Sequence, residues 1–273
     1  MTSVLDSIIQ GVQEDLAARK SKISLSELIQ ATQEVPRALP AAQLLQARSF
    51  SVIAEVKRAS PSKGHLSDIT DPAELAFSYQ TGGAQVISVL TEERRFNGSL
   101  ADLDAVRRKV SVPILRKDFM VDEYQIWEAR AHGADVILLI VAGLTDQQLN
   151  SLNALAIELG MSVLVEIHDE SELVRALQIQ PSLIGVNARN LKTLEVDLVT
   201  CHNLLPLIPT GVVAIAESGI SSTNEVVDLV TAGAQAVLVG EALVTGGTPA
   251  QTVAEWTKAG EHAREMFLMN RGS

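Results

Sequence analysis

Gly83-Ala-Gln-Val-Ile-Ser-Val-Leu90 has two close copies in this chain, Gly133-Ala-Asp-Val-Ile-Leu-Leu-Ile140 and Gly233-Ala-Gln-Ala-Val-Leu-Val-Gly240. The copies start 50 and then 100 residues apart, and Ser182-Leu-Ile-Gly-Val-Asn187 lies where a missing fourth copy is expected. Each segment is rich in Val, Ile and Leu and lacks polar alternation. Such runs are typical of strands that are buried on both faces, as in a parallel sheet.

Four further segments lie between these copies and end in charged or hydroxyl side chains. They are Ser51-Val-Ile-Ala-Glu-Val-Lys57, Val112-Pro-Ile-Leu-Arg-Lys-Asp118, Ser162-Val-Leu-Val-Glu-Ile-His168 and Val212-Val-Ala-Ile-Ala-Glu-Ser218. Because they carry the same aliphatic pattern, we expect them to be strands as well. The two sets together predict eight strands at a spacing of about 25 residues.

Helical patterns fill the gaps between the expected strands. Examples are residues 72–80, 122–132, 145–159, 169–178 and 221–232. Thr145 and Ser222 stand at N-cap positions, and Gly160 and Gly233 follow the same two helices, as is typical of helix ends. Strands that alternate with helices predict a parallel sheet. Eight regular units in a chain of 273 residues favour closure into an α/β (β/α)8 TIM barrel.

Residues 1–48 precede the first expected strand. Within them, residues 5–18 and 25–32 look helical, and Pro36 and Pro40 mark a linker. So short a segment cannot hold a hydrophobic core of its own. We therefore expect residues 1–48 to be an N-terminal helical extension that covers a barrel formed by residues 49–273, so that residues 1–273 make a single domain.

The composition narrows the class of protein. The formal charge of −11 argues against a nucleic-acid partner, because a phosphate backbone requires clustered Lys and Arg. Cys201 is the only cysteine, which excludes an intramolecular disulfide and fits a reducing compartment. The longest apolar run, Val136 to Leu144, is nine residues, whereas a membrane-spanning helix needs about 20. The N-terminus lacks the basic region of a signal peptide. We expect a soluble, cytoplasmic protein without a membrane partner.

Polar side chains gather at the ends of the expected strands, where barrels of this fold have their active sites. These residues are Glu55, Lys57, Lys117, Glu166, Asn187 and Ser218. Glu55 and Lys57 are two apart on one strand and therefore share a face, whereas Arg116 and Asp118 are expected to face outward or to support the site. Acids and bases brought together in a partly desolvated cup have their pKa values moved toward neutrality, as proton-transfer chemistry requires.

Two later loops favour a phosphate ligand. They are Ala216-Glu-Ser-Gly-Ile220 and Val239-Gly-Glu-Ala-Leu243, which follow the seventh and eighth expected strands. Barrels commonly bind phosphate there through backbone N–H groups. Gly219 and Gly240 allow the backbone to approach the ligand closely. The five His residues show no metal-binding spacing. We therefore expect a small phosphorylated substrate and no metal.

Several motifs of this sequence resemble those of one enzyme family. Ile53-Ala-Glu-Val-Lys-Arg-Ala-Ser-Pro-Ser-Lys-Gly64 closely resembles the first-strand motif of indole-3-glycerol phosphate synthase, an enzyme family of tryptophan biosynthesis. Later segments match in order: Leu115-Arg-Lys-Asp-Phe119, Leu164-Val-Glu-Ile-His168, Ile184-Gly-Val-Asn-Ala-Arg-Asn-Leu191 and Ala216-Glu-Ser-Gly-Ile220. The resemblance runs from about Leu5 to the last helix and so covers nearly the whole chain.

The resemblance implies a lyase that closes a ring with loss of CO2 and water. The substrate would be 1-(2-carboxyphenylamino)-1-deoxyribulose 5-phosphate and the product indole-3-glycerol phosphate, without a cofactor. Lys117 suits the acid that protonates the ketone oxygen, and Glu55 suits the carboxylate that stabilises the cationic intermediate. Glu166 suits the base of the dehydration step. Lys57 is the alternative acid, and the sequence does not divide the proton transfers between the two lysines because they titrate in one coupled cluster.

The resemblance also implies which residues bind the substrate. Asn187, Ser218 and Glu217 would orient the sugar hydroxyls, and Arg189 would support the loop. Gly219, Gly240 and Glu241 would surround the phosphate, although many members have Ser where this chain has Glu241. The aromatic end would lie near Pro61, Phe119 and Leu138, with Lys57 near the carboxylate, and Ser60 is a further substrate-binding residue. Oligomeric state stays open, with a monomer or a weak homo-oligomer expected.

Two alternative functions remain to be weighed. Phosphoribosylanthranilate isomerase shares the barrel and the phosphate site, but that family uses a Cys near the end of its first strand, where this chain has Glu55 and Lys57. A barrel that serves only as a binding or scaffold protein should lack converging ionisable groups at its strand ends. The motifs favour the synthase over both.

Overall fold

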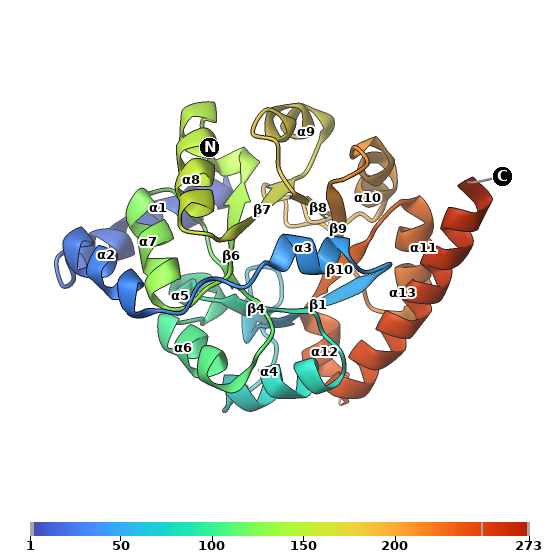
Figure 1. Cartoon of the computed structure of the whole chain (residues 1–273), viewed down its shortest axis with the longest axis horizontal. Helices are drawn as coiled ribbons and strands as arrows, with labels where there is room; N and C mark the ends of the chain where they lie inside the picture. The colour runs from blue at the N-terminus through green and yellow to red at the C-terminus, as the bar shows by residue number, and fades with distance from the viewer. Residues whose placement is uncertain (1–2, 247, 272–273) are drawn as a thin grey trace.

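Eight parallel strands close into a barrel in the computed structural model, which describes residues 3–246 and 248–271 (Figure 1). The strands are β1 Ser51–Val56, β4 Val86–Leu90, β5 Ile114–Lys117, β6 Val136–Ile140, β7 Ser162–Ile167, β8 Leu183–Asn187, β9 Val213–Glu217 and β10 Ala236–Val239. Each pairs with its neighbour in chain order, and β1 closes the ring by pairing with both β4 and β10. The predicted (β/α)8 barrel is confirmed.

Helices surround the barrel and connect its strands (Figure 1). The main ones are α4 Pro72–Thr81, α6 Leu100–Lys109, α7 Glu123–Ala131, α8 Asp146–Glu158, α9 Glu170–Leu177, α10 Val199–Leu204, α11 Thr223–Ala232 and α13 Pro249–Arg271. Short helical pieces complete the loops: α5 Glu93–Phe96, α12 Glu241–Thr245, η1 Val141–Gly143 and η2 Leu205–Leu207. Thr145 and Ser222 each form a capping box at a helix start, as predicted.

Two hydrophobic cores follow from the alternation of side chains along each strand. Outward-facing residues such as Val52, Ile87 and Val165 pack under the surrounding helices. Inward-facing residues such as Ile53 and Leu164 fill the barrel interior. The interior is therefore a packed core, and free space is left only where the inward side chains become polar at the ends of the strands.

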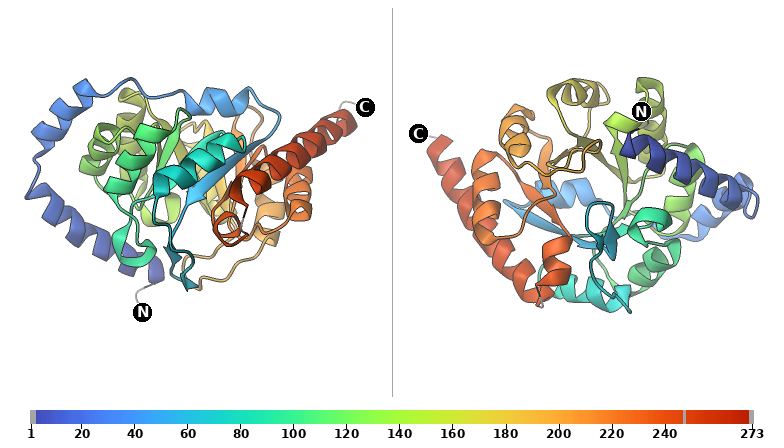
Figure 2. Two further views of the ribbon diagram at one scale, coloured as in Figure 1. Left: turned by 90° about the horizontal axis from the view of Figure 1, so that it is seen from below. Right: turned by 180° about the vertical axis from the view of Figure 1, so that it is seen from behind.

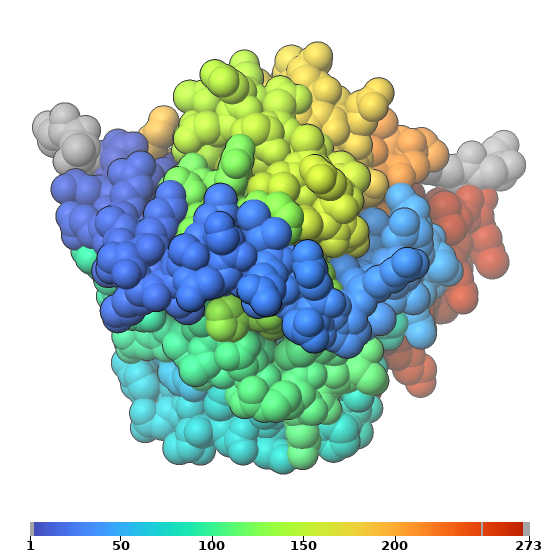
Figure 3. Space-filling view, turned by 60° about the vertical axis from the view of Figure 1, so that its left-hand side comes forward, coloured from blue at the N-terminus to red at the C-terminus, as the bar shows by residue number. Residues whose placement is uncertain are grey.

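The N-terminal helices run along the outside of the barrel from one end to the other (Figure 2, left). They are α1 Val4–Lys20, α2 Leu25–Glu34 and α3 Ala41–Gln46. The backbone N–H of Ala42 in α3 donates to Ser162 Oγ at the start of β7, 3.1 Å away. Figure 3 shows the N-terminal segment in blue, extending across the surface of the neighbouring helices. These contacts support our proposal that residues 1–48 and the barrel of residues 49–273 make one domain.

None of the helices among the described residues is long and apolar enough to span a lipid bilayer.

A buried ion network ties α1 and α7 to the outer face of β5. Arg116 is 1% exposed, and its Nη2 lies 2.9 Å from Asp118 Oδ2 and 2.9 Å from Glu128 Oε2. Arg19 of α1 donates to the other oxygen of Glu128 at 2.9 Å. Arg116 also donates to Thr91 Oγ1 and to a backbone carbonyl of α7. As expected, Arg116 points away from the barrel interior and supports the wall.

Replacing Arg116 with Met should destabilise the protein by about 3–5 kcal/mol, because buried Asp118 would lose its counter-charge and buried Glu128 would keep only that of Arg19. The measurement is the free energy of unfolding in urea. Arg108→Met on the exposed face of α6 is the matched control and should change that free energy by no more than about 0.5 kcal/mol. Equal effects of the two substitutions would contradict the structural role of Arg116.

Candidate active site

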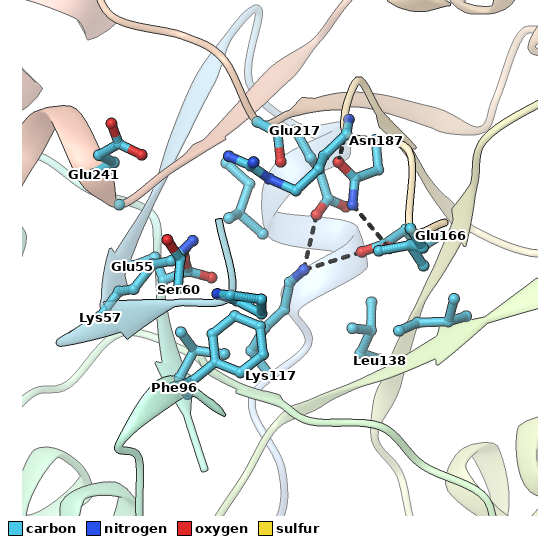
Figure 4. A pocket seen from close by; sticks show the side chains of 18 of the residues that line it. Glu55, Lys57, Ser60, Phe96, Lys117, Leu138, Glu166, Asn187, Glu217 and Glu241 are labelled. Atoms are coloured by element: carbon cyan, nitrogen blue, oxygen red, sulfur yellow. Dashed lines mark hydrogen bonds and ion pairs between the residues drawn. The ribbon is translucent and has the colours of Figure 1, made fainter. Parts of the chain in front are cut away.

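One pocket opens at the carboxyl ends of the strands, and its space, open mouth included, is about 980 Å³ (Figure 4). All fifteen residues expected in the site line it: Glu55, Lys57, Ser60, Pro61, Lys117, Phe119, Leu138, Glu166, Asn187, Arg189, Glu217, Ser218, Gly219, Gly240 and Glu241. A pocket of this size suits a small ligand. The structure thus brings the expected residues together, while their individual roles stay predictions.

The strand pattern explains why charged groups face into this pocket. On each of four strands an inward apolar residue is followed, two positions later, by an inward charged one: Ile53 and Glu55, Leu115 and Lys117, Leu164 and Glu166, Ile215 and Glu217. Side chains two apart on a strand share a face. The apolar members close the interior below, and the charged members form the floor of the pocket above them.

Lys117 lies at the centre of this floor. Its Nζ is 3.0 Å from Glu166 Oε2 and 3.0 Å from Glu217 Oε2, as the dashed lines of Figure 4 show. Glu166 and Glu217 are each 1% exposed. One ammonium group therefore bridges two buried carboxylates, on strands that are 49 and 100 residues away from it in the sequence.

Environment pushes the pKa values of these groups apart. Burial opposes the charged form of Lys117, but the charges of Glu166, Glu217 and Glu55 raise the pKa of Lys117 above its usual value. Burial would raise the pKa of Glu166, but Lys117, His168 and Asn187 lower it well below its usual range. Burial and the charges of Glu166 and Glu55 raise the pKa of Glu217 to about 7, although Lys117 opposes the shift.

Two glycines in the barrel wall make room for carboxylates. A Cβ atom on Gly185 of β8 would lie 1.9 Å from Glu217 Oε1, and one on Gly240 would lie 2.8 Å from Glu55 Oε1. Any larger residue at either position would displace the carboxylate. Glu217 Oε1 accepts no hydrogen bond within the described part of the chain, which fits a carboxyl group that carries a proton on that oxygen.

Glu55 on the floor also pairs with Lys57, which lies two residues further along the chain and nearer the rim. Lys57 Nζ is 3.5 Å from Glu55 Oε1 and 5.8 Å from the centre of the Phe96 ring. Glu55 Oε2 accepts from Ser88 Oγ at 3.3 Å. The two lysines that the sequence left equivalent are therefore distinct: Lys117 lies between two buried carboxylates, and Lys57 lies between Glu55 and an aromatic ring.

The loop after β1 contacts the rest of the rim. It forms a small hairpin of β2 Ala59–Ser60 and β3 Gly64–His65, which the sequence did not predict. Ser62 accepts a 2.8 Å hydrogen bond from Arg189, and Lys63 forms an ion pair with Glu241. Many related proteins were expected to have Ser at the position of Glu241. Here the Glu241 side chain is paired with Lys63 of the loop after β1.

The expected phosphate region has a backbone suited to an anion. Ser218 and Gly219 have φ values of 69° and 77°, so the chain turns sharply through the left-handed region as it leaves β9. A non-glycine residue in that region is strained, and such strain is concentrated at functional sites. At the end of the neighbouring strand β10, α12 begins directly after Gly240, and the first N–H groups of a helix have no acceptor within it.

Several pocket residues were missed in the sequence. Val4 and Ile8 of α1 and Phe96 of α5 line the pocket, as do Leu191 and Leu194 in the loop after β8. The i, i+4 spacing of Val4 and Ile8 is a sign of one apolar helix face, but no local pattern tells which surface that face covers. Among residues 3–246 and 248–271, no group of three or more His, Cys, Asp and Glu side chains is arranged to hold a metal ion.

Solved structures with little sequence identity share the fold. The chain is similar to 3-hexulose-6-phosphate synthase from Salmonella typhimurium, with a TM-score of 0.65, 14% identity, and coverage of 78% of this chain and 100% of that one. It is also similar to thiamine phosphate pyrophosphorylase from Pyrococcus furiosus, with a TM-score of 0.61, 13% identity, and coverage of 80% and 98%. At such identities the likeness shows the barrel fold alone.

Sequence relatives are much more similar. The chain is 59% identical to indole-3-glycerol phosphate synthase of Rhodococcus jostii (strain RHA1) and 54% identical to indole-3-glycerol phosphate synthase 1 of Streptomyces coelicolor (strain ATCC BAA-471 / A3(2) / M145). Each match covers 95% of this chain and 97% of the relative. A family model described as indole-3-glycerol phosphate synthase matches residues 5–256. The chain therefore belongs to the indole-3-glycerol phosphate synthase family.

Proposed function

We propose that the pocket closes the indole ring of indole-3-glycerol phosphate. Lys117 is the acid, Glu55 stabilises the cationic intermediate, Glu166 is the base, and Glu217 helps to orient the sugar hydroxyls. The chain is an enzyme of tryptophan biosynthesis, a lyase that acts on a small phosphorylated substrate and releases CO2. The observation that carries the proposed assignment is the bridge from Lys117 to two buried carboxylates. The substrate is 1-(2-carboxyphenylamino)-1-deoxyribulose 5-phosphate.

The first step is attack of the ring carbon that bears the carboxylate on the ketone of the sugar chain. The developing charge on the ketone oxygen requires a proton donor, and Lys117 presents an ammonium group at the centre of the floor. The ring becomes cationic as the new bond forms. Glu55 is the buried carboxylate that stabilises this charge, in a site where little water weakens the attraction.

In the second step CO2 leaves the same ring carbon, and the electron pair of the broken C–C bond returns to the ring and neutralises its charge. The last step, dehydration, needs a base and a group that protonates the departing hydroxyl. In the resting pocket Glu166 is a weak base, because Lys117, His168 and Asn187 lower its pKa. Transfer of a proton from Lys117 to the substrate removes the largest of these favourable charges. The pKa of Glu166 then rises, so that the carboxylate becomes a stronger base after the acid step has occurred. We assign protonation of the hydroxyl to Lys57, the second lysine of the pocket, which is paired with Glu55.

The two anionic ends of the substrate are bound apart from each other. We assign the phosphate to the backbone around Gly219, Gly240 and Glu241, where a strained turn and a helix start face the pocket. The aromatic end lies against the apolar side formed by Pro61, Phe119, Leu138 and Phe96. Lys57 is placed near the aromatic carboxylate.

The localisation of the enzyme, its partners and its oligomeric state are also proposals. The formal charge of −11 supports the absence of a nucleic-acid partner, and we propose that the enzyme is cytoplasmic. The single Cys201 is buried and free, which suits a reducing compartment. The chain by itself brings all fifteen expected residues to one pocket, so the proposed reaction needs no second subunit, and we propose a monomer or weak homo-oligomer.

Purified protein mixed with 1-(2-carboxyphenylamino)-1-deoxyribulose 5-phosphate should produce the absorbance of an indole. The product should appear in step with release of one equivalent of CO2, because ring closure and decarboxylation belong to one reaction. A folded sample that forms no indole would rule out the proposed function.

Replacing Lys117 with Met should lower kcat by roughly 10²–10⁴, the range expected for a positioned acid. The long apolar side chain fills the space of the lysine, but two buried carboxylates lose a counter-charge, so circular dichroism must show that the barrel still folds. Lys192→Met is the matched control, because Lys192 is an exposed ammonium group on a mouth loop that does not line the pocket. Turnover of Lys117→Met within a few-fold of the control would remove Lys117 from the mechanism.

Replacing Glu217 with Gln should change the dependence of stability on pH. The pKa of Glu217 is about 7 in the folded protein and 4.5 for an unperturbed Glu, so the folded state binds more protons between these values. The contribution of this group to the free energy of unfolding is complete below pH 4.5 and is lost as the pH rises through 7. Relative to the wild type, the variant should therefore gain on the order of 2 kcal/mol from pH 4 to pH 8.

The measurement is urea unfolding of both proteins at several pH values. Glu170→Gln in the exposed first turn of α9 is the control, and its difference from the wild type should stay flat. A flat difference for Glu217→Gln as well would show that its carboxyl group is not perturbed in the folded state.

A further inference from the structure

His168 lies just behind the pocket and contacts one of its carboxylates. It follows β7 directly and does not line the pocket. Its Nε2 lies 3.4 Å from Glu166 Oε1, and its Nδ1 lies 3.0 Å from Glu172 Oε2. The side chain is only 13% exposed. One imidazole ring thus stands between two carboxylates, and only the first of these belongs to the pocket.

Glu172 holds this ring in a fixed orientation. It stands in the first turn of α9, whose N-cap Asp169 accepts from the backbone N–H of Glu172 at 2.9 Å. Glu172 Oε2 accepts from both the backbone N–H of His168, at 2.8 Å, and the ring Nδ1. A carboxylate in the first turn is favoured by the helix dipole. Glu172, which anchors the ring, is therefore a charged group whose own position is set by backbone contacts.

The two oxygens of Glu166 have different partners. Oε2 contacts Lys117 at 3.0 Å. Oε1 accepts from Asn187 Nδ2 at 3.0 Å and lies next to His168 Nε2. Nε2 is buried and makes no hydrogen bond of ordinary geometry within the described part of the chain. His168 therefore offers a spare donor to the oxygen that does not contact the acid.

We propose that His168 is a positioning residue: as an imidazolium ion anchored by Glu172, it holds Glu166 in its ionised form with Oε2 turned toward Lys117 and the substrate. This inference rests on the proposed function and assigns a role to a residue outside the pocket. The ring acts through Glu166 and does not touch the substrate. The unit Glu172–His168–Glu166 keeps the base charged until Lys117 gives up its proton.

The charges around the ring support this protonation state. Glu166 faces it from β7 and Glu172 from α9, and Asp169 at the start of α9 also interacts with its charge. Burial would lower the pKa of His168, but the two carboxylates raise it to about 10. The ring therefore carries a positive charge at neutral pH, and both of its nitrogens are donors.

A purely structural role would give a different result. If His168 only tied the end of β7 to α9, an Asn side chain that donates to Glu172 would replace it without effect on the chemistry. His168→Asn keeps a donor near the position of Nδ1 but removes Nε2 and the positive charge. The pH dependence of the reaction separates the two roles, because only the loss of charge changes the proton affinity of Glu166.

For His168→Asn we expect kcat to fall roughly 10-fold, because a displaced catalytic group is costly, while KM stays within about 2-fold. Loss of the positive charge should raise the pKa of Glu166, so the acid limb of the kcat profile should move to higher pH by about one unit. An unchanged profile overturns the proposal, whether or not kcat falls, because a fall in kcat alone describes a structural residue.

His132→Asn is the matched control. His132 Nδ1 is 2.7 Å from Asp104, so it is also a paired, half-buried imidazole, but it ends α7 at the opposite end of the barrel. This variant should keep kcat within about 2-fold and leave the acid limb in place. If His168→Asn does not fold, Glu172→Gln replaces it and should move the acid limb in the same direction, because it removes the anchor.

A second measurement does not depend on activity. The ring nitrogens of the full chain are followed by NMR as a function of pH. His168 should stay doubly protonated at a pH of about 8 in the wild type, and Glu172→Gln should lower its pKa. Titration of His168 near its ordinary value overturns the inference even if indole is formed. Absence of indole formation with a charged His168 would instead refute the proposed function.

Discussion

The barrel mouth depends on one ammonium group. Lys117 contacts two carboxylates that are almost fully buried, and without it both would be costly to leave charged away from water. Its charge lowers the pKa of Glu166, whereas burial and neighbouring carboxylates leave Glu217 near neutrality. The contacts that stabilise the resting site also couple the protonation of Lys117, Glu166 and Glu217. A proton that leaves Lys117 changes the proton affinity of both partners at once.

Space in the barrel wall is as important as charge. Gly185 and Gly240 leave room for the carboxylates of Glu217 and Glu55, and a single added carbon at either position would overlap them. A closed barrel packs its interior with side chains, and these two carboxylates fit because the neighbouring position has no side chain. In our interpretation these glycines shape the floor of the site, besides the phosphate role that the sequence suggested for Gly240.

The outside of the barrel supports the mouth through adjacent residues of one strand. Lys117 faces inward, and Arg116, the preceding residue, faces outward into the network with Asp118 and Glu128. That network continues to Arg19 of α1, and the other end of α1 places Val4 and Ile8 in the pocket lining. The N-terminal segment is therefore connected both to the strand that carries Lys117 and to the pocket. On the side of β7, Glu172 and His168 connect α9 to Glu166 in a similar way.

The sequence by itself determined the eight strands, their connecting helices and the end of the barrel at which the polar residues lie. These features are local: aliphatic runs, capping residues and glycines are read within a few positions, and parallel strands bring their carboxyl ends to one edge. The tertiary structure alone decided which groups touch. Lys117 meets Glu166 and Glu217 only because the barrel closes over separations of 49 and 100 residues. The same closure gave Lys57 and Lys117 different partners, brought α1 and Phe96 to the pocket, and placed His168 behind Glu166. The sequence could not show these contacts, because no local pattern encodes a contact between distant strands and helices.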